Sequence, residues 1–349
     1  MTLLLIGLNH RTAAVALREQ LALPPRDLPA ALHALRTDGT VDEAVILSTC
    51  NRIECYVASS DPFAAGRHMV DLLTHHSRLE PQAFAGQLYR LTDQEATRHL
   101  FRVASGLDSM ILGESEITAQ VKQAYVAAQA AGAVGPVLHR LFQKALHGAK
   151  IIRTRTRIAD GQASIGSIVL ALAQEHLGDR LTEAGVLLWG AGKAAEATAR
   201  HLTDGGVRHL WIVNRTPEKA QDLAALCSGG WLSWEQAMAH LARVDIAVIC
   251  TQAPHYVIDA GDLAGLLPRR TDRPLLLVDL AVPRNVEPAL THHRGVHLYN
   301  IDDLNAIAQA TVAARHRALQ DCAPLIEDQV NHCWRRSEAT ALQWEVVPC

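Results

Sequence analysis

One cysteine stands in a polar turn directly after an apolar run. The run covers residues 44–47, and Ser48-Thr49-Cys50-Asn51-Arg52-Ile53-Glu54 follows it. A free cysteine is most often a small hydrophobic core residue, but the polar and charged neighbours make this stretch poor core material. A strand that ends at Cys50, with Arg52 two residues on, would present a thiolate stabilised by a cation. The pattern therefore favours Cys50 as a nucleophile.

A second candidate site is the glycine turn Gly190-Ala191-Gly192-Lys193-Ala194-Ala195, which follows the apolar run 186–189. It contains the first two glycines of the G-x-G-x-x-G/A fingerprint and alanine at the third position. Between a strand and a helix, these glycines let the backbone approach a pyrophosphate at the helix N-terminus. We interpret the turn as a dinucleotide-binding loop, and a cofactor-free α/β fold is the alternative.

The residues after the next apolar run, 209–213, distinguish the two nicotinamide cofactors. NAD sites usually carry Asp or Glu there for the ribose 2′-hydroxyl, whereas this chain has Asn214-Arg215-Thr216. One cation and two small polar groups suit a 2′-phosphate, so NADPH is favoured over NADH. The alternative is that Arg215 is a solvated loop residue. A nucleophilic thiol together with NADPH fits reduction of an acyl thioester to an aldehyde, or the reverse reaction.

The spacing of apolar residues divides the chain into three parts, and 349 residues exceed what one hydrophobic core usually organises. Residues 1–157 are predicted to form an N-terminal α/β catalytic domain. Residues 158–297 alternate strands and helices, which predicts a Rossmann-type, doubly wound parallel sheet that binds the cofactor. In the third part, residues 298–349, apolar residues recur every three or four positions from 304 to 333. This spacing predicts one long helix, which Pro324 should bend or interrupt.

The expected elements follow from apolar periodicity and from turn residues. Helices are expected near 14–23, 27–36, 63–76, 94–103, 116–131, 135–158 and 193–202. Strands are expected near 3–8, 44–47, 55–57, 186–189, 209–213, 245–250, 275–279 and 296–299.

The composition excludes several classes of protein. Hydrophobic residues make up 49 % and charged residues 20 % of the chain, as in soluble globular proteins. No apolar run approaches the ~20 residues of a membrane helix, and the short apolar N-terminus lacks the basic residue of a signal peptide. The seven cysteines are scattered without a CxxC, so neither a disulfide framework nor a metal site is predicted. We expect a reducing, cytoplasmic compartment.

Charge is unevenly distributed, although the net charge is only −3. Between Glu116 and Asp160 the chain has no acidic residue, but it has seven basic ones, Lys122, Arg140, Lys144, Lys150, Arg153, Arg155 and Arg157. Such a stretch either attracts a polyanion or forms the solvated face of a helix.

Four runs, in this order, resemble the glutamyl-tRNA reductase family. They lie at 7–13 (Gly-Leu-Asn-His-Arg-Thr-Ala), 48–54, 106–117 (Gly-Leu-Asp-Ser-Met-Ile-Leu-Gly-Glu-Ser-Glu-Ile) and 279–284 (Asp-Leu-Ala-Val-Pro-Arg). The resemblance covers about residues 3–335. It implies a V-shaped enzyme with a catalytic domain, an NADPH domain and a long spinal helix.

The resemblance also implies a reaction. Cys50 would attack the ester carbonyl of glutamyl-tRNA(Glu), the tRNA would leave, and hydride reduction of the thioester would yield glutamate-1-semialdehyde for tetrapyrrole (5-aminolevulinate, porphyrin) biosynthesis. No metal or ATP is implied for this step. The tRNA backbone then becomes a partner for the basic stretch, and the downstream glutamate-1-semialdehyde aminomutase is a candidate partner for the product.

Carried over position by position, the resemblance assigns roles to further residues. His99 matches a histidine that is important for activity, and either proton transfer or positioning would explain its role. Arg52 would hold the substrate side-chain carboxylate with its planar fork. The other expected substrate-binding residues are Thr49, Asn51, Ser109, Glu114, Ser115, Glu116 and Gln120. Acidic residues at 114–116 would also stabilise the N-terminus of the following helix.

The chain departs from the family pattern in three places. It stops at Cys349, about where a helical dimerisation domain would begin, so the homodimer of the family is not carried over to it. Ala14 stands where proline is usual, and the segment 160–166 departs from the usual serine-rich linker, which could alter the hinge between domains.

Two other functions compete with glutamyl-tRNA reduction. A shortened paralogue would reduce another aminoacyl-tRNA, but Arg52 speaks for glutamate. A catalytically idle tRNA-binding or partner-binding regulator would need neither Cys50 nor the glycine turn. An ordinary aldehyde dehydrogenase would leave the basic stretch unexplained.

Overall fold

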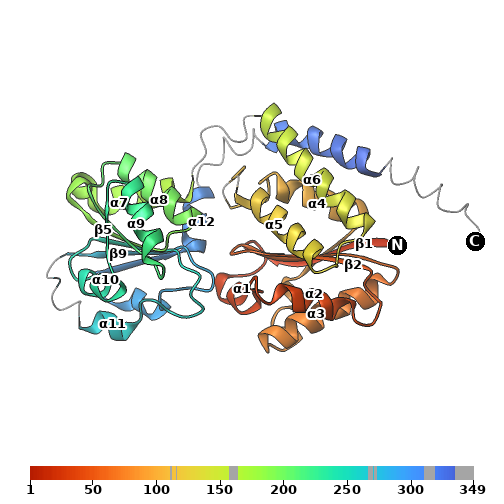
Figure 1. Cartoon of the computed structure of the whole chain (residues 1–349), viewed down its shortest axis with the longest axis horizontal. Coiled ribbons are helices and arrows are strands. Elements are labelled where there is room, and N and C mark those ends of the chain that lie inside the picture. The colour runs from red at the N-terminus through yellow and green to blue at the C-terminus, as the bar shows by residue number, and fades with distance from the viewer. Residues whose placement is uncertain are drawn as a thin grey trace, which may run out of the picture. The chain divides into compact units, whose positions relative to one another are not determined.

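The computed structural model describes residues 1–110, 112–114, 116–156, 164–265, 270, 273–309 and 319–334, without side-chain detail at 308 and 309. The chain divides into two compact units, residues 1–162 with 311–349 and residues 163–310 (Figure 1). The predicted boundary at 157/158 lies outside the described residues. Residues 298–349, predicted to form one part, contribute to both units.

A four-stranded antiparallel sheet forms the centre of the first unit. Its strands are β1 (Thr2–Asn9), β2 (Glu43–Ser48), β3 (Arg52–Ser59) and β4 (Tyr89–Thr92), in the order β2-β3-β1-β4. β1, β2 and β3 are buried on both faces, which explains the nearly continuous apolar sequences of β1 and β2. β3 also carries the buried charged residues Arg52 and Glu54. β4 alternates half-buried and exposed residues, as an edge strand does.

Helices cover both faces of this sheet. They are α1 (Val15–Leu21), α2 (Leu28–Arg36), α3 (Pro62–Ser77), α4 (Asp93–Ala104), α5 (Glu116–Ala130) and α6 (Pro136–Arg155). In Figure 1, α1, α2 and α3 lie on one face and α4, α5 and α6 on the other. Phe142 of α6 packs edge-to-face on Tyr56 of β3, with ring centroids 5.4 Å apart. The sheet is therefore the middle layer of a three-layer unit.

The helix 319–334 packs on this first unit. It buries Cys322, Ile326, Val330 and Cys333, which lie on the predicted apolar face. Arg98 of α4 donates from Nε to Glu327 Oε1 at 2.5 Å, and Trp334 Nε1 donates to the Thr97 hydroxyl at 3.1 Å. Pro324 lies within this helix. The sequence predicts that this helix is continuous with α12 (Ile301–Gln309), but residues 310–318 between them are outside the described residues.

The second unit contains a six-stranded parallel sheet. Its strands are β5 (Gly185–Trp189), β6 (His209–Val213), β7 (Gly230–Trp231), β8 (Ile246–Ile249), β9 (Leu275–Asp279) and β10 (Val296–Asn300), in the order β10-β9-β8-β5-β6-β7. From β5 the chain adds β6 and β7 on one side of the sheet. It then adds β8, β9 and β10 on the other side of β5. This is the doubly wound arrangement that the sequence predicts, with its switch point between β5 and β8.

The connections of the second unit are mostly short helices. They are α7 (Ile165–Leu177), η3 (Gly178–Glu183), α8 (Lys193–Asp204), α9 (Pro217–Leu226), α10 (Trp234–His240), α11 (Ala260–Ala264), η5 (Pro288–His292) and α12 (Ile301–Gln309). Among the residues that the structure describes, no helix is long and apolar enough to cross a membrane.

Candidate functional site

Cys50 lies in the tight turn that joins β2 to β3. Ser48 pairs with Ile53, and Thr49 closes the turn because its backbone N–H donates to the Arg52 carbonyl at 2.8 Å. The Thr49 hydroxyl accepts from the backbone N–H groups of Asn51 and Arg52, both at 3.2 Å. β3 thus begins at Arg52, three residues earlier than predicted, and Arg52 is a strand residue.

A buried arginine supports the Cys50 turn from α1. Arg18 donates from Nε to the Cys50 carbonyl at 3.1 Å and from Nη1 to the Ala13 carbonyl at 2.8 Å. It is completely buried, so its charge lies close to the turn in a medium of low polarity. Sequence reasoning did not identify Arg18, because nothing in its helix marks it as different from an exposed arginine.

The Cys50 turn forms one wall of a small pocket. The pocket is lined by Thr49, Cys50, Asn51, Arg52, Ser109, Glu114, Glu116, Ile117 and Gln120. These residues come from the β2–β3 turn, the segment after α4, and the first turns of α5. The structure therefore brings together every expected substrate-binding residue that it describes; Ser115 lies outside the described residues.

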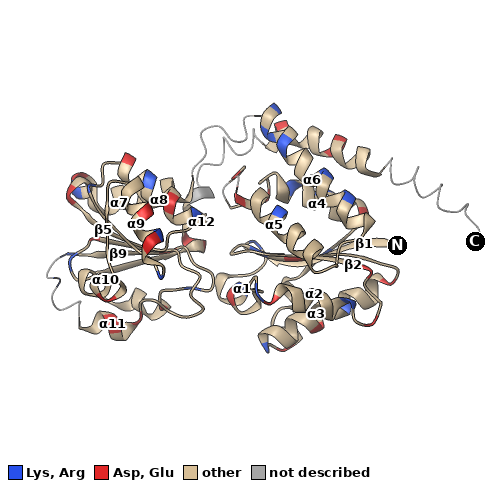
Figure 2. Cartoon of the chain, in the orientation of Figure 1, with Lys and Arg blue, Asp and Glu red and all other residues tan. Residues whose placement is uncertain are grey.

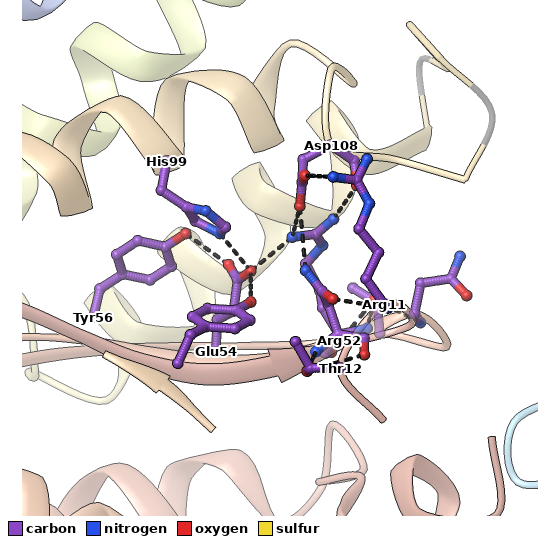
Figure 3. A network of polar contacts seen from close by, with 11 residues as sticks. Arg11, Thr12, Arg52, Glu54, Tyr56, His99 and Asp108 are labelled. Carbon is purple, nitrogen blue, oxygen red and sulfur yellow. Dashed lines mark hydrogen bonds and ion pairs between the residues drawn. The ribbon is translucent and has the colours of Figure 1, made fainter. Parts of the chain in front are cut away.

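Arg52 is buried beside the pocket and is held by two acidic residues (Figure 3). Its Nη1 donates to Glu54 Oε1 at 2.6 Å and to Asp108 Oδ2 at 3.1 Å, and its Nη2 donates to the Asp108 carbonyl at 2.6 Å. Arg11 contacts the other oxygen of Asp108 at 3.2 Å. The end of the guanidinium is thus fixed, and its Nε–H is buried without an acceptor among the described residues.

Glu54 is the centre of the same network. Its Oε1 lies 2.6 Å from the Tyr89 hydroxyl and 2.7 Å from His99 Nε2, and its Oε2 accepts from the Tyr56 hydroxyl at 2.6 Å. Burial raises the pKa of Glu54, but the charges of Arg52 and His99 outweigh burial and hold that pKa well below its usual range. Glu54 is therefore an ionised internal carboxylate.

His99, the predicted catalytic histidine, belongs to this network and does not line the pocket. Its Nε2 is engaged by Glu54. Through this contact His99 holds the Glu54 carboxylate, which in turn binds Arg52. Sequence reasoning missed Glu54, Tyr56, Tyr89 and Asp108 as parts of the site, although two of them lie inside the motif runs.

The electrostatics of Cys50 differ from the expectation. Burial raises the pKa of its thiol to about 12, and the nearby carboxylates Glu114 and Glu116 act in the same direction. Arg18 is the cation that opposes them. The predicted stabilisation of the thiolate by Arg52 is not seen, because Arg52 is paired with Glu54 and Asp108. In this structure Cys50 is a thiol at neutral pH.

Glu114, which lines the same pocket, occupies an unusual environment. Burial raises its pKa to about 7, and Glu116 acts in the same direction. A hydrogen bond from Ser109 and the charges of Arg52 and Arg153 oppose this rise without cancelling it. Glu114 therefore exchanges a proton near neutral pH, unlike an ordinary exposed glutamate.

The second unit offers a different kind of site at the end of β5. Gly190 has a φ of +114°, and a Cβ there would lie 2.6 Å from the carbonyl oxygen of Cys250, which follows β8. A Cβ at Gly192 would meet nothing within 4 Å, so the backbone is open to an approaching group there. Ala195, the third small residue, is fully buried. The turn thus fits a pyrophosphate at the N-terminus of α8.

The residues after β6 complete this candidate dinucleotide site. Asn214 donates from Nδ2 to the Thr216 carbonyl at 3.0 Å, and Arg215 and Thr216 are exposed. No acidic side chain occupies positions 214–216 to accept from a ribose 2′-hydroxyl. In the described part of the chain, no group of three or more His, Cys, Asp or Glu side chains is placed to hold a metal ion.

Comparisons with known protein families divide the chain as the structure does. The family described as "Glutamyl-tRNAGlu reductase, N-terminal domain" matches residues 6–156. The family "Shikimate / quinate 5-dehydrogenase" matches residues 171–307. The second match, together with the doubly wound sheet and the glycine turn, indicates a nicotinamide cofactor.

Individual relatives extend this similarity over nearly the whole chain. A glutamyl-tRNA reductase of Moorella thermoacetica is 41 % identical over 320 residues, which are 92 % of this chain and 73 % of the relative. One from Xanthomonas campestris is 43 % identical over 330 residues, 95 % of this chain and 74 % of the relative. The solved structure of glutamyl-tRNA reductase from Methanopyrus kandleri is 34 % identical, with a TM-score of 0.53 over 97 % of this chain and 81 % of that one.

Proposed function

This chain belongs to the glutamyl-tRNA reductase family, and on that premise we propose that it reduces glutamyl-tRNA(Glu) to glutamate-1-semialdehyde with NADPH. This reaction is the first step of the C5 pathway to tetrapyrroles. The observation that carries the proposal is that Cys50 and the buried Arg52 line the same pocket. The proposed domains are residues 1–157 for catalysis, 158–297 for NADPH and 298–349 for the spine.

Arg52 selects the amino acid in this proposal. Its end is held by Glu54 and Asp108, and it lines the pocket with a buried Nε–H that has no acceptor among the described residues, so we assign it the side-chain carboxylate of the glutamyl group. Thr49, Asn51, Ser109 and Gln120 supply polar groups around that carboxylate. Because the network fixes the guanidinium before substrate binds, little conformational entropy is lost on binding.

Cys50 performs the covalent step. Its sulfur attacks the ester carbonyl, the bond from that carbon to the tRNA ribose oxygen breaks, and the glutamyl group remains on Cys50 as a thioester. The substrate ester is already activated, so the leaving group is an alcohol and no further activation is required. When bound, the nicotinamide would supply the hydride that reduces the thioester to the aldehyde, and the Cys50 sulfur would leave as a thiolate that regains a proton from solvent.

NADPH is the proposed form of the cofactor. Arg215 and Thr216 are exposed directly after β6, and the position that NAD enzymes fill with a carboxylate carries Asn214. A 2′-phosphate would gain charge-assisted hydrogen bonds from the arginine. Gly190 and Gly192 would bring the backbone to the pyrophosphate.

The basic stretch serves two purposes in this proposal. Lys and Arg side chains are spaced along α5 and α6 (Figure 2). Arg140, Lys144 and Arg153 donate to backbone carbonyls at Cys333, His332 and Glu114, so these cations stabilise the unit. Lys122, Lys150 and Arg155 are exposed and are the proposed contacts to the tRNA phosphates. Arg157 lies outside the described residues.

Two further assignments rest on sequence. We place the protein in the cytoplasm because its cysteines are scattered without a disulfide pattern. The aldehyde product is reactive, so transfer to the downstream aminomutase is the proposed fate.

The test is a stoichiometric reaction with purified protein, glutamyl-tRNA(Glu) and NADPH. The absorbance of reduced cofactor is followed while the aldehyde is trapped, with the Cys50→Ser variant as control. Cofactor oxidation with aldehyde formation in the wild type alone is the expected result. Equal activity with tRNAs charged by other amino acids would identify a paralogue instead. Binding of tRNA with neither deacylation nor cofactor oxidation would identify a regulator.

A further inference from the structure

The proposed chemistry needs a proton acceptor, and the two predicted catalytic residues, Cys50 and His99, do not supply one. The Cys50 thiol must lose its proton to attack, and its pKa is about 12. His99 does not line the pocket, and its Nε2 faces Glu54. Among the described pocket residues, the acidic side chains that could take the proton are Glu114 and Glu116. Glu114 is half-buried, whereas Glu116 is exposed.

We propose that Glu114 is the proton-transfer group of the Cys50 pocket. Its carboxylate takes the proton from Sγ as the sulfur–carbon bond forms. The resulting carboxylic acid gives that proton to the ribose oxygen of the tRNA as the carbon–oxygen bond breaks. The thiol proton thus appears on the leaving alcohol, and Glu114 returns to its starting state. This inference rests on the proposed function, because it assigns the proton in the acyl transfer from tRNA to Cys50.

The backbone around Glu114 is firmly held, as a proton-transfer group requires. The N–H of Gly113 donates to the Gly106 carbonyl at 2.8 Å and closes the loop that begins after α4. Gly106 has a φ of +76°, and a Cβ there would lie 2.8 Å from the Cα of Gly113. Arg153 of α6 donates from Nη2 to the Glu114 carbonyl. The carboxyl group is therefore presented to the pocket by a closed loop fixed to α6.

Among the described residues, charges from three elements act on Glu114. Arg52 approaches from β3, Arg153 from α6 and Glu116 from α5, while Ser109 donates a hydrogen bond from the same loop. Their combined effect with burial leaves the pKa of Glu114 at about 7. A group that is half ionised near the working pH both accepts and donates protons effectively.

Cys50 and Glu114 are also coupled to each other. After burial, the negative charge of Glu114 is the largest influence that raises the pKa of the Cys50 thiol. Removing this charge should therefore make the thiol easier to ionise. The same change would remove the group that carries the proton. Reactivity of the free thiol and the rate of acyl transfer should consequently move in opposite directions, and the pH profile of alkylation should shift to lower pH. A loosened pocket that only admits the reagent would raise alkylation at every pH, including at high pH where the thiol is already ionised.

The experiment compares the full-length wild type with Glu114→Gln. Alkylation of Cys50 by iodoacetamide is measured by peptide mapping across the pH range. Thioester formation from glutamyl-tRNA(Glu) is measured in a single turnover without NADPH. In Glu114→Gln, alkylation at neutral pH should rise severalfold, about tenfold for each unit by which the thiol pKa falls. Thioester formation should fall by about 100-fold. Glu95→Gln, at an exposed position of α4, is the matched control and should change neither rate.

Several results would overturn the inference. Parallel losses of alkylation and thioester formation would mean that Glu114 only maintains the pocket. An unchanged rate of thioester formation would remove it from proton transfer. N-acetylglutamyl-tRNA lacks the ammonium group of the substrate. If Glu114→Gln and the wild type form the thioester from it at equal rates, Glu114 binds that ammonium group instead. Failure of the wild type itself to form a thioester would refute the proposed function, a result separate from any effect of the variant.

Discussion

The Cys50 pocket and the glycine turn are two different kinds of site: the first depends on side chains and the second on exposed backbone. Charged and polar side chains line the pocket, and they come from a hairpin turn, a loop and a helix that are distant in sequence. At the glycine turn the absence of side chains matters, and one contiguous segment supplies the whole feature. The first site should therefore be sensitive to the chemistry of each side chain, and the second to added volume.

Replacing the nucleophile should have the largest effect. Cys50→Ser exchanges one sulfur for oxygen in a turn that the Thr49 and Arg18 contacts hold, so the fold should persist. Reduction of glutamyl-tRNA should fall by more than about 1000-fold, because an alcohol is a far weaker nucleophile than a thiolate. Aldehyde trapping measures activity and thermal unfolding measures stability. Retained reductase activity would remove Cys50 from its role.

Arg52→Lys should have the next largest effect. A lysine cannot bind Glu54 and Asp108 and still present a planar edge to the substrate, so kcat/KM for glutamyl-tRNA should fall by about 100-fold. Arg90→Lys, at an exposed arginine of β4, is the matched control. An unchanged kcat/KM in Arg52→Lys would place the carboxylate elsewhere in the pocket.

A bulky side chain at the glycine turn tests the contrasting site. Gly192→Leu should be tolerated by the fold, since a Cβ there meets nothing within 4 Å, yet its side chain would occupy the space proposed for the pyrophosphate. The dissociation constant for NADPH should rise by roughly 30-fold, about 2 kcal/mol. Alkylation of Cys50 should be unchanged. Gly265→Leu, another open glycine of the second unit, serves as control; equal effects of both would show that the substitution acts through the fold.

The smallest effect is expected for Arg215→Ala, at the proposed contact to the 2′-phosphate on the ribose of the cofactor. Arg215→Ala removes an exposed cation, so NADPH affinity should fall by about tenfold while NADH affinity changes by less than about twofold. Fluorescence titration with both cofactors measures the difference. Equal losses for the two would contradict a contact to the 2′-phosphate.

The contrast also explains what could be predicted from the sequence. The glycine turn is local: one hexapeptide after a buried strand indicates its fold and ligand class. Most strands and helices were likewise predicted within a few residues. α7 was missed because its sequence is apolar around most of its circumference and gives no clear amphipathic signal. β4 was missed because it is short and lies at the sheet edge.

The pocket could not be predicted in the same way, because the residues that contact one another in it are far apart in the sequence. Arg52 meets Asp108, 56 residues later, and His99 meets Glu54, 45 residues earlier. No local pattern distinguishes a buried carboxylate from a surface one, so the partners of Arg52 and the position of His99 away from the pocket emerged only from the fold. Motif resemblance identified the residues that line the pocket, and it did not reveal how charges are paired behind them.

The order of the chain has a consequence for its synthesis. The first unit contains residues 1–162 and the helix 319–334, so the second unit is inserted within the first. Arg98 of α4 and Glu327 of the helix 319–334 form an ion pair within the first unit, although they are 229 positions apart in the sequence. Domains usually complete their folding in the order in which they leave the ribosome. Here the nascent chain must extend past residue 334 before Cys322, Ile326 and Val330 can be buried. Translation of the first unit, which contains Cys50, therefore begins before that of the second unit, but its folding is completed last.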